Sequence, residues 1–388
     1  MTIELVSSWN ELSSLEAHWN ELAGDMPFRS WDWLAMWWKH YGTGATDSRN
    51  EERPQTAEKQ LYVLAVFGQD GRGNTQDGKP LIGIAPWYLD RTVIHGNVLR
   101  WLGSGEVCTD HLSLICRSEH RQQVAAAVAE ELTANCDDWD RIDLGAVDAD
   151  DAAVAALVDA FEERDCLVSR HAANAFWVLE MPQTWDDYLA SISKSHRKQL
   201  RQLERRVLES QRVRWHQVAS AGELPAVWEI LVDLHQRRRK SLGEPGCFAS
   251  RQFHDFHREV TQRLLARGQL RMSWLALDGS PAAAEYHVAD SSATYAYQGG
   301  VDPERLAEEP GRLSAILCLR AAIAEGHSRV DFLRGDEPYK AHWRAAPQPT
   351  FDCRIIPNRR LARLRGRVLN VTGAITDWVR QTIEQKSP

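Results

Sequence analysis

The chain has 388 residues, more than one ordinary domain of ~100–200 residues, so its length predicts two domains. Hydrophobic residues make up 43% and charged residues 26%, a composition that excludes a wholly disordered or fibrous protein. The net charge of −8 conceals a division, because residues 1–193 carry 14 Lys and Arg against 32 Asp and Glu, whereas residues 194–388 carry 32 against 22. We therefore expect an anionic ligand at the basic second half.

The seven cysteines form no C-x-x-C pair, which argues against a disulfide framework or a zinc ribbon and favours a reducing cytoplasm. The first ten residues lack the basic and apolar regions of a secretory signal. No run approaches the ~18 apolar residues of a membrane span. His254 and His257 have the i,i+3 spacing of two ligands on a helix, but no third ligand is near, so we expect no metal.

Hydrophobic patterning predicts the same order of elements in both halves. The first half is predicted to have strands over 61–67, 81–89, 98–102, 111–115 and 141–144, with an amphipathic helix over 121–135. The second is predicted to have strands over 270–277, 282–289, 293–297 and 329–333, a tight turn at 278–281 and a helix over 311–325. The match of RIDL at 141–144 to RVDF at 329–332 favours two diverged copies of one unit over chance similarity.

Between these units, residues 185–268 are predicted to be mainly helical. The helix over 194–206 is basic, with Ile192, Leu200, Leu203 and Val207 as its apolar stripe. Such a helix suits an acidic saccharide, a lipid-linked phosphate or RNA, although a solvated surface is the commoner use. The stretch 359–383 is amphipathic and suits either a peripheral membrane contact or packing on the domain. The tryptophans of residues 31–38 can stack on a sugar ring, although packing in the hydrophobic core is the commoner use of such side chains.

Four segments carry a family resemblance: SKSHRK (193–198), GEPGCF (243–248), YQGGVD (297–302) with PG (310–311), and DFLRGDEPYK (331–340). They resemble the cellulose-biosynthesis-associated acetyltransferase group of the Gcn5-related N-acetyltransferase (GNAT) superfamily. The group is similar to the Fem-type aminoacyltransferases. The segment YKAHW (339–343) resembles the aromatic-Lys-x-x-aromatic motif of those enzymes.

The resemblance implies an α+β fold of two tandem acetyltransferase-like domains, each a mostly antiparallel twisted sheet flanked by helices. We expect a diverged N-terminal domain over 1–181 and an acyl-CoA-binding domain over 182–356, with a helical insertion at 185–268. A basic amphipathic helix is expected over 357–388.

The donor implied by the resemblance is acetyl-CoA or another acyl-CoA, held between the fourth and fifth strands. The helix start Gly311, Arg312, Leu313 and Ser314 can offer N–H groups to its pyrophosphate. Of the superfamily's phosphate loop only Gly311 remains, so a plain helix cap is the alternative. Tyr297, Gln298 and Gly299 end a strand beside Gly300, where a bulge can bring N–H groups close to the ligand.

Acyl transfer to an amine also needs a base, which predicts a carboxylate in the cleft. We expect Asp336 to be this base, with Glu337 second, and Tyr339 to return a proton to the leaving thiolate. Arg334 and Lys340 are expected to bind a phosphate or an anionic acceptor, with a surface salt-bridge cluster as the alternative. Glu285 and His287 share one strand face and are expected to line the acceptor pocket, although a lone strand histidine is more often structural.

The sequence thus predicts an N-acyltransferase that moves an acyl group, most simply acetyl, to an amine such as an amino sugar or polysaccharide precursor. One alternative is Fem-like aminoacyl transfer from charged tRNA, with the basic helix on RNA phosphates. Another is a non-catalytic binding subunit in exopolysaccharide synthesis, which the incomplete phosphate loop favours.

Overall fold

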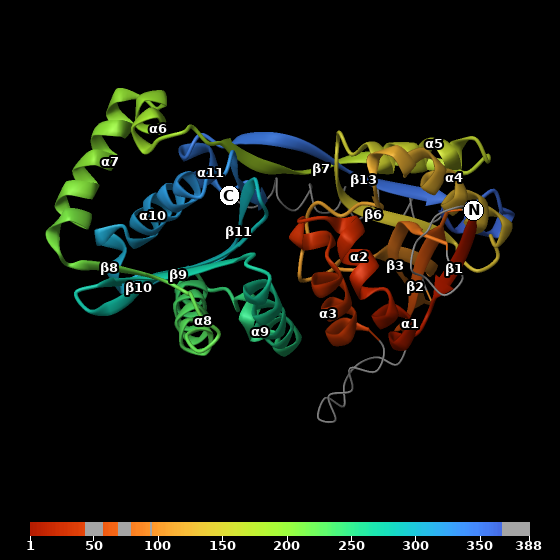
Figure 1. Ribbon diagram of the computed structural model, residues 1–388, viewed down its shortest axis with the longest axis horizontal. Helices are drawn as coiled ribbons and strands as arrows, with labels where there is room; N and C mark the ends of the chain where they lie inside the picture. Colours follow the sequence, from red (N-terminus) through yellow and green to blue (C-terminus); the bar gives the residue numbers. More distant parts are fainter. Residues whose placement is uncertain (43–56, 69–78, 94, 367–388) are drawn as a thin grey trace, which may run out of the picture.

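Two lobes share one continuous sheet, and the long strands β7 and β13 join them (Figure 1). The computed structural model describes residues 1–42, 57–68, 79–93 and 95–366. The N-terminal lobe contains β1 (Thr2–Val6), α1 (Trp9–Ser14), α2 (Glu16–Ala23), α3 (Trp31–Tyr41), β2 (Ala57–Phe67), β3 (Leu81–Thr92), β4 (Gly96–Trp101), β5 (Ile115–Cys116), α4 (Arg121–Ala134), β6 (Arg141–Asp148), α5 (Ala152–Glu162) and β7 (Leu167–Glu180).

The C-terminal lobe repeats this order after two linking helices. Its elements are α6 (Trp185–Ser191), α7 (Lys194–Arg206), β8 (Val213–Gln217), α8 (Leu224–Ser241), α9 (Arg251–Ala266), β9 (Leu270–Leu277), β10 (Ser280–Ala289), β11 (Ala293–Val301), α10 (Pro310–Ala324), β12 (Arg329–Arg334), α11 (Pro338–His342) and β13 (Ala346–Ile356). Figure 1 shows α8 and α9 on one face of this lobe's sheet and α10 on the other.

Strand pairing confirms the repeat. Strands β1 to β4 and β8 to β11 form antiparallel meanders, and each meander ends in a parallel pair, β4 with β6 or β11 with β12. Arg141 pairs with Val98 as Arg329 pairs with Ala293, so the short motif match marks equivalent strands. The predicted mostly antiparallel architecture in two repeated units is confirmed, although the two units form one continuous sheet instead of two separate ones.

The last strand of each copy lies beside the other copy. Strand β7 pairs with β12, β13 pairs with β6, and β7 and β13 pair with each other along most of their length. Neither half of the sheet is complete without a strand from the other half of the chain. The predicted domain limits, which stay a prediction, fall next to the ends of β7 and β13.

Aromatic side chains fill the contact between the lobes. Trp33 of α3 lies edge-on to Phe256 of α9 and to Tyr297 of β11, with ring centroids 5.3 and 5.4 Å apart. Trp31, Trp33 and Trp37 are at most 3% exposed, so they pack in the core and offer no face for sugar stacking. The stripe of α7 is also buried, as its spacing predicted.

The prediction of a strand over 111–115 is wrong for all but its end, because only Ile115–Cys116 pairs, with β3. His111 has φ 59°, a left-handed conformation that a strand cannot contain, and its ring binds acidic side chains of both lobes. The turn after β9 is confirmed. Asp278 and Gly279 both have positive φ, as a two-residue hairpin turn requires.

The predicted amphipathic tail lies mostly outside the described residues. Its described start contacts the N-terminal lobe, where Arg359 and Arg365 pair with Asp140 at 2.7 and 2.6 Å. Within the described ranges, no helix combines the length and apolarity needed to cross a bilayer.

Gly300 on β11 lies directly against the backbone of α8. A methyl group added there would be 2.5 Å from the backbone N of His235 and 2.9 Å from the carbonyl carbon of Leu234. Gly300→Ala is therefore expected to destabilise the protein by about 1–3 kcal/mol, since backbone atoms cannot yield as a side chain can. Urea unfolding measures this, with Gly222→Ala as the control because nothing lies within 4 Å of that position. Equal unfolding midpoints for the two variants would contradict the prediction.

Candidate active site

The candidate site lies where β11 and β12 stop pairing. Their parallel ladder runs only from Ala293 and Arg329 to Tyr295 and Asp331. Beyond it, β11 stays paired with β10 but contains one extra residue, Tyr297, because His287 faces Ala296 and Tyr286 faces Gln298. The predicted bulge is therefore present on β11. The equivalent pairing of β3 with β4 is continuous from Trp87–Trp101 to Thr92–Gly96, so the two copies differ at this strand.

Glu285 and His287 lie on one face of β10, as their spacing predicted. The Glu285 carboxylate is 3.5 Å from Nε2 of His287, and both side chains are less than a fifth exposed. Glu285 pairs across the ladder with Gly299, where an added methyl group would come 2.7 Å from Glu285 Oε2. The carboxylate thus lies over Gly299, next to the bulge, and a larger residue at 299 would displace it.

Tyr339 on α11 faces the same region. Its ring packs 5.9 Å from that of Phe332, and about 50% of the residue is exposed. Partial burial, followed by the negative charges of Glu337 and Glu285, raises the pKa of Tyr339 above its ordinary value. The hydroxyl is therefore protonated at neutral pH, as that of an ordinary tyrosine is.

Lys340 and Glu337 hold the loop that follows β12. The Lys340 ammonium, on a residue that is 2% exposed, donates to the carbonyl oxygens of Leu333, Arg334 and Gly335 at 3.1, 2.7 and 3.1 Å. It also pairs with Glu337 at 2.9 Å. Burial raises the pKa of Glu337, but Lys340 outweighs it and the net pKa is lowered. Lys340 therefore anchors this loop and has no N–H left for the predicted anionic ligand.

Arg334 and Asp336 are also placed away from the Glu285 carboxylate. The Arg334 guanidinium binds Asp110 and donates to the Thr109 carbonyl at 2.9 Å, so its partners belong to the N-terminal lobe. Asp336 is exposed, and among the described residues no hydrogen bond or ion pair fixes its carboxylate. The structure thus brings Glu285 and His287 together, places Tyr339 near enough to feel the charge of Glu285, and leaves Asp336 exposed.

The start of α10 gathers groups suited to an anion. The first helical bond joins Leu313 N to Glu309 O, which leaves the N–H groups of Gly311 and Arg312 ahead of it. The Arg312 side chain binds Glu309, while its buried Nε and Nη2 atoms have no partner. Leu313 and Ser314 are fully buried, so their side chains belong to the core.

Two histidines that sequence reasoning had not selected border this helix start. The rings of His196 on α7 and His342 on α11 lie 4.0 Å apart. Burial, the neighbouring His342 and Arg312 lower the pKa of His196 to about 4, so it is neutral at physiological pH. Both histidines stand in segments that carry the family resemblance, but their proximity depends on the packing of α7 against α11.

The predicted residues Tyr297 and Gln298 contribute differently. The Tyr297 hydroxyl donates to the Val107 carbonyl at 2.6 Å and lies 3.0 Å from His257 Nε2, inside the aromatic contact between the lobes. Its side chain therefore faces away from a donor, and only its backbone belongs to the bulge. Gln298 is half-buried. His257 is itself fully buried among these rings, which accounts for one histidine of the i,i+3 pair.

Comparison with known proteins identifies the second lobe. Residues 194–341 match the family model described as an acetyltransferase (GNAT) domain. The C-terminal lobe contains a GNAT-superfamily acetyltransferase domain. This match confirms the resemblance to the superfamily and the predicted class of enzyme, an acyltransferase. A search among curated proteins found no significant match.

Solved structures resemble the whole chain around this GNAT domain. FemX is 11% identical, with 91% of this chain and 97% of that chain covered and a TM-score of 0.58. A conserved protein of unknown function from Bacteroides thetaiotaomicron is 10% identical, with 92% and 100% covered and a TM-score of 0.53. At these identities the likeness concerns the fold alone, and it extends over both lobes.

Proposed function

We propose that the GNAT domain transfers an acyl group, in the simplest case acetyl, from acyl-CoA to an amine. The observation that carries the proposal is the bulged strand β11, with the Glu285 carboxylate over Gly299 at the point where β11 and β12 part. A thioester held there lies beside backbone N–H groups that can stabilise its oxyanion. The start of α10 supplies N–H groups and the unpartnered Arg312 nitrogens for the pyrophosphate.

In the proposed reaction the amine nitrogen attacks the thioester carbonyl carbon, and the carbon–sulfur bond breaks. Glu285, supported by His287, accepts the proton that the amine loses. Tyr339, which like an ordinary tyrosine is protonated at neutral pH, donates its hydroxyl proton to the leaving thiolate. Glu285 thus takes the role that the sequence had suggested for Asp336. Arg312 keeps the pyrophosphate-binding role that the sequence suggested for it, and Lys340 is not proposed as a phosphate ligand because its ammonium binds backbone carbonyls and Glu337.

Titration calorimetry with acetyl-CoA tests donor binding. Arg312→Gln is expected to weaken the affinity for acetyl-CoA about tenfold or more, because hydrogen bonds to a charged group are lost. Arg320→Gln on the same helix is the control, since Arg320 pairs with Glu204 at 2.8 Å. Absence of binding to the wild-type protein, or equal affinities in both variants, would reject the proposed donor site.

Aminoacyl transfer from charged tRNA is a second candidate, favoured by α7. Lys194, Arg197 and Lys198 in its first turns form no ion pair within the described residues, and they adjoin His196 beside the α10 start. A charged-tRNA donor would bind with an affinity that falls steeply as salt rises. Salt-dependent retention of charged tRNA, together with no binding of acetyl-CoA, would replace the first proposal with this one. The amino-sugar acceptor rests on the family resemblance alone.

A further inference from the structure

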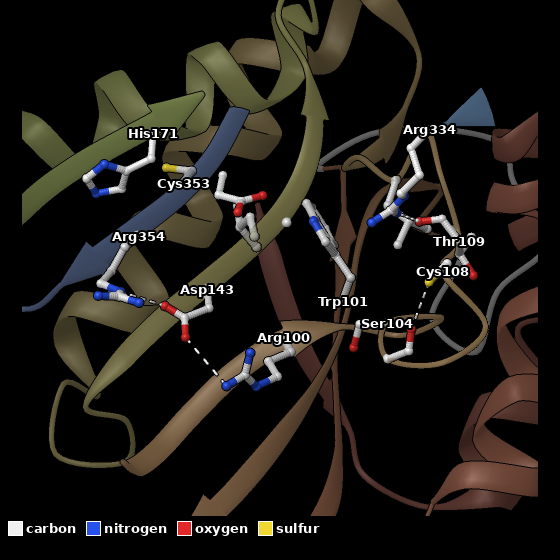
Figure 2. Close-up of a pocket in the computed structure, with 15 residues that line it drawn as sticks. Arg100, Trp101, Ser104, Cys108, Thr109, Asp143, His171, Arg334, Cys353 and Arg354 are labelled. Carbon is white, nitrogen blue, oxygen red and sulfur yellow. Dashed lines mark hydrogen bonds and ion pairs between the residues drawn. The ribbon is translucent and has the colours of Figure 1, made fainter. Parts of the chain in front are cut away.

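The N-terminal lobe has a cavity of its own, of about 420 Å³, at the position that matches the candidate site of the other copy (Figure 2). Strands β4 and β6 pair only from Val98 and Arg141 to Arg100 and Asp143. The cavity opens where this pairing ends, beside Trp101 and Gly145. Acyl transfer in the GNAT domain, as proposed above, makes no use of it.

Guanidinium groups converge on one side of this cavity. Asp143 pairs with Arg141 at 2.9 Å, with Arg354 at 3.0 Å and with Arg100 at 3.5 Å. Among the described residues, Asp90 adds a second carboxylate, 3.3 Å from Arg100. Burial lowers the pKa of Arg141, Asp143 opposes this effect, and repulsion by the charges of Arg354 and Arg100 lowers the pKa further. An added anion would relieve this repulsion.

The arginines that line the cavity remain within reach of a ligand. The side chains of Arg100 and Arg354 are 30% and 33% exposed, whereas Asp143 between them is 16% exposed. Planar guanidinium groups recognise phosphate and carboxylate groups through paired N–H donors. The other lining carboxylate, Asp352, accepts a hydrogen bond from the Ala146 N–H at 2.9 Å.

The remaining walls extend toward the GNAT domain. Figure 2 shows the Trp101 ring between the Arg100–Asp143–Arg354 side and the side formed by Thr109 and Arg334. Trp101 is 1% exposed and its indole N–H has no acceptor. Arg334 is the last residue of β12 and begins the loop anchored by Lys340. The cavity therefore reaches from Arg100 on β4 and Arg354 on β13 to the end of the strand that borders the candidate site of the second copy.

We propose that this cavity binds a phosphate or carboxylate group of the acyl acceptor, held by Arg100 and Arg354. The rest of the acceptor then extends past Trp101 and Arg334 toward the GNAT domain. This inference rests on the proposed function, and it assigns the second copy to the donor and the first copy to the acceptor's anionic end.

Calorimetry with two probes, inorganic pyrophosphate and succinate, tests the inference on the wild-type protein and on Arg354→Gln and Arg312→Gln, each in saturating acetyl-CoA so that the proposed donor site is already filled. At least one probe is expected to bind, with its affinity lowered about tenfold or more in Arg354→Gln and kept in Arg312→Gln. The probe that shows this pattern identifies the group as phosphate or carboxylate. The affinity for acetyl-CoA should fall in Arg312→Gln and stay unchanged in Arg354→Gln. Failure of the proposed donor site and failure of the proposed acceptor cavity therefore give different results.

Arg354 also ties β13 to β6, so Arg354→Lys serves as a second variant that keeps the charge and loses the paired donors. Thermal unfolding confirms that each variant is folded. Arg212→Gln, which removes an exposed pair with Asp278 at 2.6 Å, is the matched control. Binding of neither probe to the wild-type protein overturns the inference. So does an affinity in the folded Arg354 variants equal to that of Arg212→Gln.

Discussion

Replacing Glu285 with Gln is expected to lower the rate of acetyl transfer about 100-fold or more and to leave the affinity for acetyl-CoA unchanged. The change keeps the shape of the side chain over Gly299 but removes the carboxylate that accepts the amine proton. The measurement is thiol release from acetyl-CoA with glucosamine as the amine, together with calorimetry for the donor. A loss confined to turnover locates the effect in the chemical step.

Asp336→Asn decides between the two carboxylates considered for the base. Asp336 is exposed, and no hydrogen bond or ion pair from the part of the chain that the structure describes fixes its carboxylate, so this variant is expected to lose far less activity than Glu285→Gln. Wild-type turnover in Glu285→Gln, or a large loss only in Asp336→Asn, would contradict the assignment of Glu285.

Asp331→Asn is expected to destabilise the protein by about 3 kcal/mol, because it breaks a buried charged cluster that joins the two lobes. His111 lies between Asp148, at 3.1 Å, and Asp331, at 3.0 Å. Asp331 also accepts the backbone N–H of Leu333 at 2.7 Å, at the end of β12. Urea unfolding measures the loss, and Asp186→Asn, whose pair with Arg201 is exposed, is the control.

The effect of Asp331→Asn should depend on pH in a defined direction. Burial opposes a charge on His111, but the hydrogen bonds and charges of Asp148 and Asp331 outweigh it and raise the pKa of His111 to about 10. The unfolded value is about 6.5, so the stabilisation is complete below about pH 6.5 and is lost as pH rises toward about 10. The stability difference between wild type and Asp331→Asn should shrink over this range. A constant difference would contradict a charged His111.

Sequence patterning predicted the strands that have a buried face and missed those that do not. The strands of the meanders alternate apolar and polar residues, and the helices that follow them repeat apolar residues at helical spacing, because one face of each element packs on the core. Strand β7 was not predicted, since most of its residues are exposed or half-buried and show no alternation. Its partner β13 is more than 150 residues away in the chain. Such pairing, and with it the exchange of strands between copies, leaves no local pattern.

The candidate site was predictable in its segments but less so in its individual residues. Glycines 299 and 300 correctly indicated a bulged strand end, although the close approach at Gly300 is made by α8. Lys340 was expected to bind a ligand, but its partners are backbone carbonyls, which every sequence contains. Arg334 and Asp331 are paired with residues more than 200 positions away, so only the folded chain shows these contacts.

Hydrogen–deuterium exchange on addition of acetyl-CoA tests the central assignment, that the second copy binds the acyl donor. Saturating acetyl-CoA is expected to slow exchange at the bulged part of β11 and at Gly311 and Arg312 in the first turn of α10. Strand β4 in the first copy should show no change. Protection at β4 and β6 without protection at β11 and α10, or no protection in either copy, would contradict the account.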